Sequence, residues 1–495
     1  MNYKHLQNGS DIRGIALEGI PGEKVNLTKE AVYDLARGFV KYLRDKTNKK
    51  EVTISVGHDS RLSADMLKQS IIDGLLFDGA TVLECGLSST PAMFMSTVYE
   101  EFKCDGAIMI TASHLPFNRN GMKFFDKDGG LNKEDIATII KHAENQEFDH
   151  ISGASCTRAN LMDVYAQNLQ NIIKEKVNAQ DYDQPLKGLH VVIDAGNGAG
   201  GFYATKVLEP LGANVEGSQF LDPDGSFPNH IPNPEDKKAM ASICEAVKKN
   251  NADLGIIFDT DVDRSSAVDH LGNPISRNAI VALAAILANN IHQGTTIVTD
   301  SVTSDELADF LKKHGIGHHR FKRGYKNVIN EGIRLNNEGV DCQLAIETSG
   351  HAAFKENYFL DDGAYLATLI VVEAAKGKVA DLISDLEYPL EEKELRFKIL
   401  DEDFQKVGDV LLEDLKAYVA KQSNMKPADT NYEGYRVCFD HGWFLVRKSL
   451  HDPIIPCNIE SKKEGGCKEI AKELYVFLKD NTSLDLSVIT NYLEL

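Results

Sequence analysis

Residues 254–265 read Leu-Gly-Ile-Ile-Phe-Asp-Thr-Asp-Val-Asp-Arg-Ser. The apolar run Leu254–Phe258 is followed at once by a polar loop, in which Asp259, Asp261 and Asp263 alternate with other residues. Short apolar runs of this kind, alternating with amphipathic helical stretches, are typical of βαβ units. The stretch therefore predicts an α/β domain, and in such domains ligands bind beyond the carboxyl ends of the strands.

The same plan occurs three times along the chain. Each repeat has one apolar strand that ends in a polar loop and enters a helix, and later a second apolar strand that also ends in a polar loop. The strand pairs are Val52–Val56 and Ala107–Ile110, Val191–Ile193 and Leu254–Phe258, and Ile297–Val298 and Leu344–Ile346. We therefore expect three similar doubly wound α/β domains, at residues 1–160, 161–274 and 275–388. Their strand-end loops are expected to face one central cleft.

The pattern changes after about residue 390. Helical stretches near 402–421 and 466–479 flank β-like runs at Tyr435–Phe439, Phe444–Val446 and Ile454–Ile459. This alternation predicts a smaller α+β domain at residues 389–495. We expect the linker before it around Glu387–Glu392.

Composition narrows the classes of function. The chain has 495 residues and a formal net charge of −20, which argues against a nucleic-acid partner or an anionic membrane surface. Its eight cysteines form no CxxC pair, so we expect buried free thiols rather than a zinc ribbon or a redox dithiol. The start of the chain lacks a signal-peptide pattern, and the most apolar stretch, Ala279–Ile291, is too short to span a bilayer. A soluble cytoplasmic protein is expected.

Ser113 stands in Thr111-Ala112-Ser113-His114, directly after the second strand of the first repeat. A serine nucleophile needs a base, a metal or prior phosphorylation for its activation. The G-x-S-x-G elbow of serine hydrolases is absent, because Ala112 and His114 flank the serine. By itself this position favours an ordinary turn serine.

The aspartates of the second repeat offer a metal site. If the segment stays extended, alternate side chains share a face, so the carboxylates of Asp259, Asp261 and Asp263 converge. A divalent cation would relieve their repulsion, and oxygen ligands alone suit Mg²⁺. The alternative is a calcium-like surface loop or a solvated acidic turn, although the EF-hand pattern does not fit the spacing.

The ordered set of motifs resembles the α-D-phosphohexomutase family, which includes phosphoglucomutases and phosphomannomutases. The set consists of Ser10-Asp11-Ile12-Arg13-Gly14, Gly57-x-Asp59-x-Arg61, Thr111-Ala112-Ser113-His114, Asn120-Gly121-x-Lys123, Asp259-x-Asp261-x-Asp263-Arg264 and Glu347-Thr348-Ser349-Gly350-His351. The resemblance covers nearly the whole chain. It implies a heart-shaped enzyme of four domains around a central cleft.

The resemblance also implies roles at the reacting centre. Ser113 would carry a phosphoryl group, and Mg²⁺ would bridge it to Asp259, Asp261 and Asp263. Lys123 would be the general acid and base, assisted by His114, and Arg13 and Arg264 would neutralise charge. Without the motif context, Arg13, Lys123 and Arg264 would be read as solvated surface charges.

Substrate contacts are implied in the third and fourth domains. Glu347 and Ser349 would hydrogen-bond sugar hydroxyls, with Lys326 and His351 as further contacts. In Arg447-Lys448-Ser449-Leu450-His451-Asp452-Pro453, Arg447, Ser449 and Pro453 match the family's phosphate-binding loop. The intervening residues depart from it, and His451 is expected to replace a hydroxyl donor. Asp361-Asp362-Gly363 is expected to be a structural turn.

The predicted function is a phosphohexomutase that interconverts hexose 1-phosphates and 6-phosphates of glucose, mannose or both. Mg²⁺ and an activating bisphosphate such as glucose 1,6-bisphosphate are the expected cofactors, and the protein is expected to be a monomer or a small homo-oligomer. Three alternatives remain open from the sequence. They are a mutase for acetylglucosamine or glucosamine phosphate, a sugar-phosphate-binding paralogue without catalysis, and a metal-dependent phosphatase.

Overall fold

The computed structural model describes residues 2–449 and 452–495. The chain forms two compact units. The first consists of Met1–Leu287 and Ser349–Leu382, and the second of Ala288–Thr348 and Ile383–Leu495. The predicted third domain therefore contributes residues to both units. The eight-stranded and four-stranded sheets lie in the first unit and the six-stranded sheet in the second, and each unit has its own hydrophobic core.

The first sheet belongs to the N-terminal domain and has eight strands, in the order β1-β2-β6-β5-β3-β4-β8 with β7 beside β6. Its strands are β1 (Gln7–Asn8), β2 (Asp11–Ile15), β3 (Thr53–His58), β4 (Thr81–Leu87), β5 (Gly106–Ile110), β6 (Arg119–Asp126), β7 (Gly129–Gly130) and β8 (Ser155–Arg158). Strands β5, β3, β4 and β8 run parallel, whereas β6 and β2 run antiparallel to their neighbours. The carboxyl ends of the parallel strands therefore lie at one edge, where β5 delivers the loop with Ser113.

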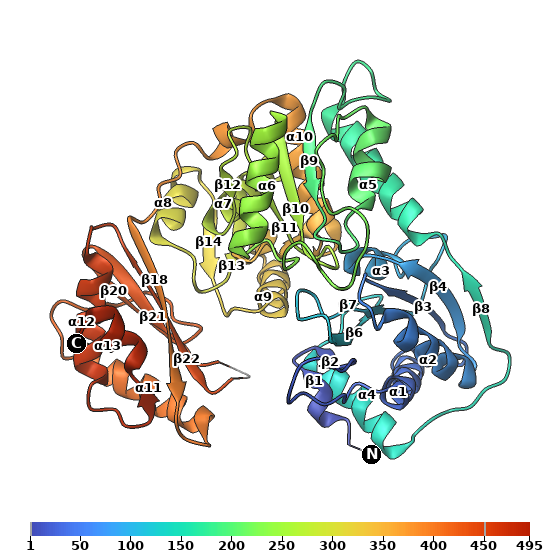
Figure 1. Ribbon diagram of the computed structural model, residues 1–495, viewed down its shortest axis with the longest axis horizontal. Coiled ribbons are helices and arrows are strands. Elements are labelled where there is room, and N and C mark those ends of the chain that lie inside the picture. The colour runs from blue at the N-terminus through green and yellow to red at the C-terminus, as the bar shows by residue number, and fades with distance from the viewer. Residues whose placement is uncertain (1, 450–451) are drawn as a thin grey trace. The chain divides into compact units, whose positions relative to one another are not determined.

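Helices α1 (Lys29–Thr47), α2 (Ala64–Phe77) and α4 (Lys133–Asn145) pack on this sheet, and Figure 1 shows them together on one side of it. The short helix α3 (Thr90–Met95) also contacts the sheet. Helix α1 begins where the Thr28 side chain accepts a hydrogen bond from the Ala31 N–H at 3.2 Å, and it ends at Asn48 in the left-handed conformation. Local capping thus fixes the first long helix.

The second sheet has the order β12-β11-β10-β9 and also lies in the first unit. Its strands are β9 (Val191–Asp194), β10 (Leu254–Phe258), β11 (Ser265–Val268) and β12 (Pro274–Ile275), and helix α6 (Lys237–Asn250) packs on it. In the chain, α5 (Leu161–Val177) precedes these strands and α7 (Asn278–Ile291) follows them. Strands β9 and β10 are parallel, and β11 returns antiparallel to β10. Instead of the expected α-helix after β9, Tyr203–Leu208 is π-helical and runs into a 3-10 turn. Pro210 lies in that turn and has no N–H to continue a regular helix.

The third repeat supplies parallel strands β13 (Thr296–Thr299), β14 (Gly317–Arg320) and β15 (Cys342–Ile346) to the second unit, with β13 in the middle. Helices α8 (Asp305–Lys313) and α9 (Tyr325–Asn337) connect them. Its last part, the antiparallel pair β16 (Ala352–Phe354) and β17 (Leu360–Asp361) and helix α10 (Gly363–Lys376), belongs to the first unit. Parallel strands joined by helices thus occur in all three repeats, as predicted.

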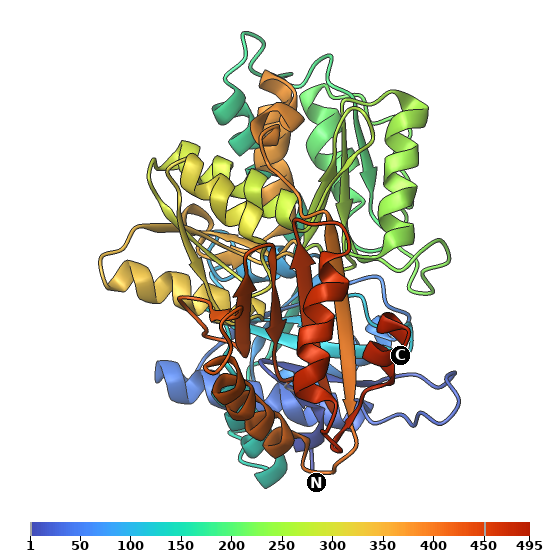
Figure 2. The same cartoon turned by 90° about the vertical axis from the view of Figure 1, so that its left-hand side faces the viewer.

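The C-terminal domain is an antiparallel sheet in the order β19-β20-β21-β22-β18-β23. Its elements are β18 (Glu391–Ile399), α11 (Phe404–Val419), β19 (Lys426–Pro427), β20 (Tyr435–Phe439), β21 (Gly442–Val446), β22 (Ile454–Ser461), α12 (Gly466–Leu478), β23 (Leu484–Asp485) and α13 (Ser487–Leu493). Helix α12 packs on β18, β21 and β22, and Figure 2 shows it lying along the strands. The α+β class is confirmed, but the predicted linker extends too far, because β18 already begins at Glu391.

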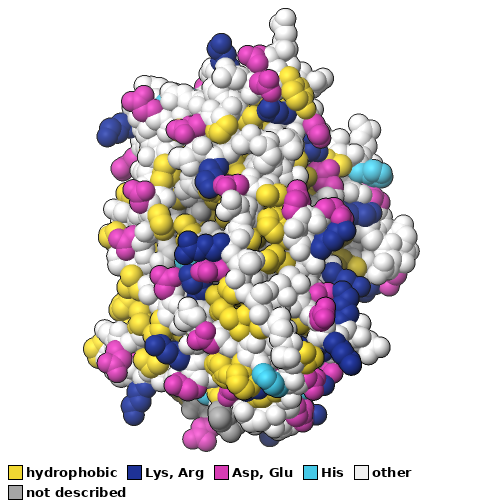
Figure 3. Space-filling model, turned by 90° about the vertical axis from the view of Figure 1, so that its right-hand side faces the viewer, with side chains coloured by type: hydrophobic (Ala, Val, Ile, Leu, Met, Phe, Trp, Pro, Cys, Tyr) yellow, Lys and Arg dark blue, Asp and Glu magenta, His cyan; other side chains and the backbone are white. Residues whose placement is uncertain are grey.

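The surface charges, the helices and the cysteines can be compared with the predictions made from composition. Figure 3 shows acidic and basic side chains interspersed over the face that it draws. Every helix in the described part of the chain is too short or too polar to cross a membrane. All eight cysteines are free, but only four are buried and Cys156 is exposed, since it lies on the edge strand β8.

Candidate active site

Ser113 lies in a strained turn just beyond β5. Its φ is +51°, a left-handed conformation that a residue with a side chain rarely adopts, and the residue is only 8% exposed. The Ser113 N–H donates to Thr111 Oγ1 at 2.9 Å, and the Thr111 hydroxyl donates to Asp59 Oδ2 at 2.7 Å. Strain of this kind persists only where the surroundings enforce it, and it concentrates at functional sites.

Arg61 holds the backbone of the Ser113 loop from beneath. Its buried guanidinium donates to the carbonyl oxygens of Ser113, Leu115, Pro116 and Arg119. The motif Gly57-x-Asp59-x-Arg61 was visible in the sequence, but no role was predicted for Arg61. A multidentate guanidinium is suited to such a cluster of carbonyls.

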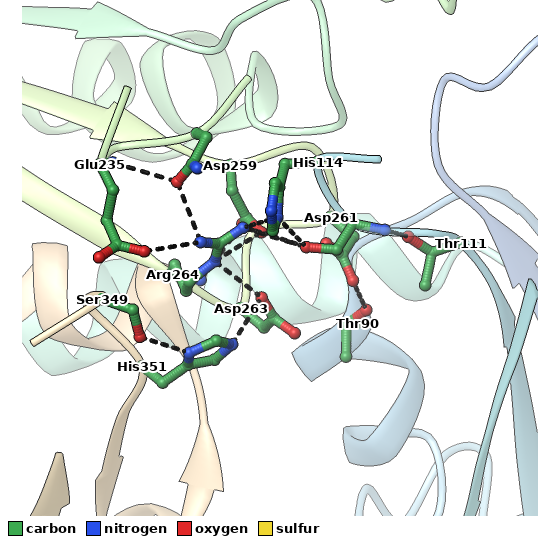
Figure 4. A network of polar contacts seen from close by, with 12 residues as sticks. Thr90, Thr111, His114, Glu235, Asp259, Asp261, Asp263, Arg264, Ser349 and His351 are labelled. Atoms are coloured by element: carbon green, nitrogen blue, oxygen red, sulfur yellow. Dashed lines mark hydrogen bonds and ion pairs between the residues drawn. The ribbon is translucent and has the colours of Figure 1, made fainter. Parts of the chain in front are cut away.

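The Ser113 hydroxyl meets residues from the second sheet. Ser113 Oγ donates to Asp259 Oδ2 at 3.2 Å and lies 3.1 Å from Arg264 Nη2. Strand β10 ends directly before Asp259, and β11 begins directly after Arg264, so the turn between these paired strands presents both. Figure 4 shows Arg264 at the centre of the resulting network. The predicted meeting of serine, metal-binding and arginine motifs is thus present within the first unit.

The three predicted metal ligands converge. Oxygen atoms of Asp259, Asp261 and Asp263 lie within 4.8 Å of one another, and all three residues are buried. Asp261 Oδ1 and Asp263 Oδ1 have no hydrogen-bond donor in the described structure. Carboxylate oxygens in this state fit a hard divalent cation such as Mg²⁺.

The cluster carries an uneven distribution of charge. Lys123 Nζ, from β6, lies 2.5 Å from Asp263 Oδ2 and 3.2 Å from Asp261 Oδ2. Burial and the negative charge of Asp263 raise the pKa of Asp259 well above its usual value. Burial acts in the same direction on Asp263, but the nearby positive charges, above all Lys123, hold its pKa below the usual range.

The N-terminus of helix α10 contacts the loop of the predicted metal ligands, residues 259–264, which we call the metal loop. Val262 has φ +66°, a strained conformation for a β-branched residue, and its carbonyl accepts from the Gly363 N–H at 3.0 Å. A Cβ at Gly363 would stand 2.5 Å from the backbone carbon of Arg264, so only glycine fits. Asp362 caps α10 by accepting from the Tyr365 N–H at 2.8 Å. The segment Asp361-Asp362-Gly363, which was expected to be a structural turn, instead joins β17 to α10 and supports the metal loop.

Two histidines border the cluster. His114 Nδ1 lies 3.3 Å from Ser113 Oγ and accepts from Arg264 Nη2 at 2.7 Å. Burial, with the positive charges of Arg264 and Arg13, lowers the pKa of His114 to about 3. His351 Nδ1 lies 2.9 Å from Ser349 Oγ, and its Nε2 lies 3.6 Å from Asp263 Oδ1. Burial lowers the pKa of His351 to about 3, so both rings are neutral at neutral pH.

Arg13 reaches the site through strand pairing. It lies on β2 opposite Gly121 of β6, and its Nη2 pairs with Asp11 Oδ2 at 2.9 Å. A Cβ at Gly121 would stand 2.2 Å from the Ile12 carbonyl oxygen and 2.9 Å from that of Thr111. The glycine of the Asn120-Gly121-x-Lys123 motif therefore lets three backbone segments meet.

The remaining predicted residues lie in the second unit. Glu347 Oε1 accepts from the Gly324 N–H at 2.7 Å, and Lys326 lies in the first turn of α9. Arg447 follows β21, where burial lowers the pKa of its guanidinium despite the nearby charge of Glu433.

The rest of the predicted phosphate loop is described in part. Ser449 Oγ accepts from the Asp452 N–H at 3.0 Å, and the Lys448 amine pairs with Asp409 on α11 at 2.5 Å. His451 lies outside the described residues, so its predicted role stays a prediction.

Glu433 is a further residue that the sequence did not single out. Its carboxylate accepts from the Arg323 N–H at 3.1 Å and from the Ser301 hydroxyl. It thereby connects the C-terminal domain to the loop before α9. No local sequence pattern marks it, because its partners are more than 100 residues away.

Comparison with known proteins places these residues in a family. Residues 4–150, 163–272 and 276–388 match the family models "Phosphoglucomutase/phosphomannomutase, alpha/beta/alpha domain" I, II and III. A phosphoglucomutase/phosphomannomutase of Thermococcus kodakarensis is 31% identical over 92% of this chain and 95% of its own. A phosphomannomutase/phosphoglucomutase of Pseudomonas syringae is 29% identical over 95% of this chain and 94% of its own.

Solved structures share the fold. A phosphoglucomutase/phosphomannomutase family protein of Burkholderia thailandensis superposes with a TM-score of 0.80 at 24% identity, covering 98% of this chain and all of its own. An Aspergillus fumigatus N-acetylphosphoglucosamine mutase, solved with GlcNAc-6P and magnesium, gives a TM-score of 0.57 at 12% identity, over 97% of this chain and 96% of its own. Since the family domains follow one another from residue 4 to residue 388, the chain belongs to the phosphoglucomutase/phosphomannomutase family.

Proposed function

We propose that this chain is a phosphohexomutase that interconverts the 1-phosphate and the 6-phosphate of glucose, mannose or both. One observation carries the proposal. Ser113 Oγ, a potential phosphoryl carrier, lies 3.2 Å from Asp259 of the carboxylate cluster and 3.1 Å from the Arg264 guanidinium. Phosphoryl transfer depends on positioning and on neutralising charge, which this arrangement supplies.

In the proposed reaction, Ser113 carries the phosphoryl group. A sugar hydroxyl attacks the phosphorus, the bond from phosphorus to Ser113 Oγ breaks, and a bisphosphorylated sugar forms. The other phosphoryl group then returns to Ser113, which leaves the isomeric monophosphate. Each transfer moves one proton from the attacking hydroxyl and leaves the number of phosphoryl groups unchanged.

We assign the proton transfers to Lys123, with His114 beside it. Lys123 lies against the carboxylate cluster, and His114 is within 3.3 Å of the reacting oxygen of Ser113. The low pKa of His114 keeps its ring neutral, so Nδ1 can accept a hydrogen bond beside the reacting oxygen. Arg264 and Arg13 would offset the charge of phosphoserine.

Asp259, Asp261 and Asp263 would hold Mg²⁺, with the phosphoserine as a further ligand. A bound Mg²⁺ supplies a positive charge to the transferring phosphoryl group. The buried carboxylate oxygens without a donor support this assignment.

We assign the binding of the sugar phosphate to further residues. We assign Glu347 and Ser349 to sugar hydroxyls, with Lys326 and His351 as further contacts. Arg447 and Ser449 would bind the phosphate that does not react, a task that suits an arginine fork. Hexose 1,6-bisphosphate would serve as activator, because it can phosphorylate Ser113.

The test measures two products at once. Purified protein is incubated with Mg²⁺, glucose 1-phosphate and a trace of glucose 1,6-bisphosphate, and both glucose 6-phosphate and free phosphate are followed. We expect glucose 6-phosphate with little free phosphate. Ser113→Ala should abolish turnover while thermal unfolding stays within about 2 °C of the wild type, because the replaced side chain is small.

The other outcomes decide between the alternatives. Free phosphate without glucose 6-phosphate would indicate a phosphatase. No product from glucose, mannose or N-acetylglucosamine phosphates would indicate a binding protein. Turnover of N-acetylglucosamine phosphate alone would move the substrate assignment to amino sugars.

A further inference from the structure

The Arg264 guanidinium is held from two sides. On the reacting side, Nη2 lies 3.1 Å from Ser113 Oγ and 2.7 Å from His114 Nδ1. On the opposite side, Nη1 donates to the side-chain oxygen of Asn233 at 3.0 Å. Glu235, two residues further along, has Oε2 only 4.0 Å from the same Nη1, and Figure 4 shows it on the side of Arg264 away from His114.

Asn233 lies in a loop without helix or strand, residues 227–236, which reads Phe-Pro-Asn-His-Ile-Pro-Asn-Pro-Glu-Asp. The loop is fastened by His230, which is 8% exposed. His230 Nε2 lies 3.0 Å from Asp194 Oδ2, and Nδ1 lies 2.9 Å from the Ile231 carbonyl oxygen. The same carbonyl accepts from the Asn233 N–H at 2.8 Å, so a continuous chain of polar contacts runs from Asp194 to Asn233.

Both ring nitrogens of His230 face acceptors, which favours the doubly protonated ring. Burial by itself would lower the pKa of His230, but the hydrogen bond and the charge of Asp194 outweigh it and raise the pKa. Asp194 is the last residue of β9 and is completely buried. The loop is therefore attached to the sheet by a buried contact between His230 and Asp194.

Two glycines after β9 allow neighbouring segments to pack closely on it. A Cβ at Gly196 would stand 2.9 Å from the Pro232 side chain and 3.3 Å from His230 Cε1. A Cβ at Gly198 would stand 2.6 Å from the carbonyl oxygen of Thr260, in the metal loop. The glycine-rich sequence Ala-Gly-Asn-Gly-Ala-Gly after β9 is thus packed between the Asn233 loop and the metal loop.

We propose that Asn233, fastened by the Asp194–His230 pair, is a positioning residue that sets the orientation of the Arg264 guanidinium over Ser113. Asn233 acts through Arg264 and does not contact the reacting oxygen. Without its acceptor, Arg264 Nη1 is free to turn toward Glu235, which draws Nη2 away from Ser113. The inference rests on the function proposed above, because it concerns the group that stabilises phosphoryl transfer.

The primary test replaces Asn233. Asn233→Ala should lower kcat about 10- to 100-fold, since small displacements of a charge-stabilising group have effects of this size, and should change KM less than about twofold. Asn233→Asp keeps an oxygen acceptor and should recover most of the loss. Ile231→Ala is the matched control, because Ile231 is 53% exposed in the same loop. It should behave like the wild type.

A double-mutant cycle separates positioning from general damage. If Asn233 acts through Arg264, then Asn233→Ala has no further effect on kcat in an Arg264→Ala background. The proposal would be overturned if Asn233→Ala lowered kcat as much in the Arg264→Ala background as in the wild type. It would also be overturned if Asn233→Ala alone had the kcat of the wild type. His230→Ala should show the same coupling, and the Asn233 variants carry the test if it does not fold.

A crystal structure of Asn233→Ala provides a readout that needs no activity. The distance from Arg264 Nη2 to Ser113 Oγ, 3.1 Å in the wild type, should increase and Nη1 should approach Glu235. An unmoved guanidinium would refute the inference even if the protein were inactive. If the wild-type protein has no mutase activity, the proposed function is refuted instead. The two failures are therefore distinguishable.

Discussion

Ser113, the proposed phosphoryl carrier, has a strained backbone. The left-handed backbone aims the hydroxyl at Asp259, and it is retained because Thr111 accepts from the Ser113 N–H while Arg61 binds the Ser113 carbonyl. The side chain that would react and the side chain that holds its backbone are 52 residues apart. The orientation of the Ser113 hydroxyl therefore depends on Arg61 as well as on the Ser113 loop.

This dependence can be tested with Arg61→Lys. A lysine ammonium keeps the charge but cannot reach the four carbonyls of the loop, so buried acceptors lose their donors. We expect a loss of about 2–4 kcal/mol in unfolding free energy and a fall in kcat/KM of about tenfold or more, measured by denaturant unfolding and the mutase assay. Arg334→Lys on α9, where the side chain is 47% exposed, is the control and should change neither. Wild-type activity in Arg61→Lys would show that the loop holds its shape unaided.

At the scale of elements, strands β2, β5 and β6 bring separate functional groups together. Arg13 on β2 lies opposite Gly121 of β6, and Lys123 of β6 lies opposite Met109 of β5. This pairing of β6 with β2 and β5 is possible because Gly121 has no side chain where the Ile12 and Thr111 carbonyls approach. The positions of Arg13 and Lys123 are therefore consequences of one close strand contact.

Gly121→Ala should separate these strands. Its Cβ would lie 2.2 Å from a backbone oxygen that cannot move independently of β2. We expect destabilisation by about 2–3 kcal/mol and a fall in kcat, since Arg13 and Lys123 are displaced together. Gly377→Ala is the control, because no atom lies within 4 Å of its Cβ and its φ of 171° suits any residue. Equal thermal unfolding of the two variants would contradict the proposed close contact.

At the scale of the whole molecule, the second unit joins the C-terminal domain to the strands of the third repeat. Arg436 of β20 stacks 3.5 Å from the Trp443 ring and donates to the Thr303 carbonyl oxygen at 2.9 Å. Its Nη2 pairs with Asp305 at 2.8 Å, and Val302 packs on Trp443. A buried cation with several acceptors thus fastens the two segments, with Glu433 as a second link.

Arg436→Ala should weaken this junction. It leaves the Thr303 carbonyl without its donor and a gap beside Trp443, so we expect a loss of about 2–4 kcal/mol. Scanning calorimetry should show a lower unfolding temperature, and hydrogen exchange should rise in β20 and in residues 300–305. Arg396→Ala on β18, 64% exposed, is the matched control and should stay within about 0.5 kcal/mol. Unchanged hydrogen exchange in Arg436→Ala would show that Arg436 does not hold these two segments together.

The sequence by itself determined the repeated strand-and-loop plan, the α+β end of the chain and the residues that meet at Ser113. Those features follow from short-range patterns, since apolar runs fix the buried strands and the carboxyl ends of parallel strands share an edge. The carboxylate triad was readable for the same reason, because its members alternate within five residues.

Tertiary structure alone decided which residues support the site. Ser113 and Asp259 are 146 residues apart, and the roles of Arg61, Asn233, His230 and Glu433 depend on partners from other elements. A hydrogen bond between distant segments leaves no period or spacing in the sequence. Its donor and acceptor are chosen by the packing of the sheets and loops, and for that reason the supporting residues were found only in the folded chain.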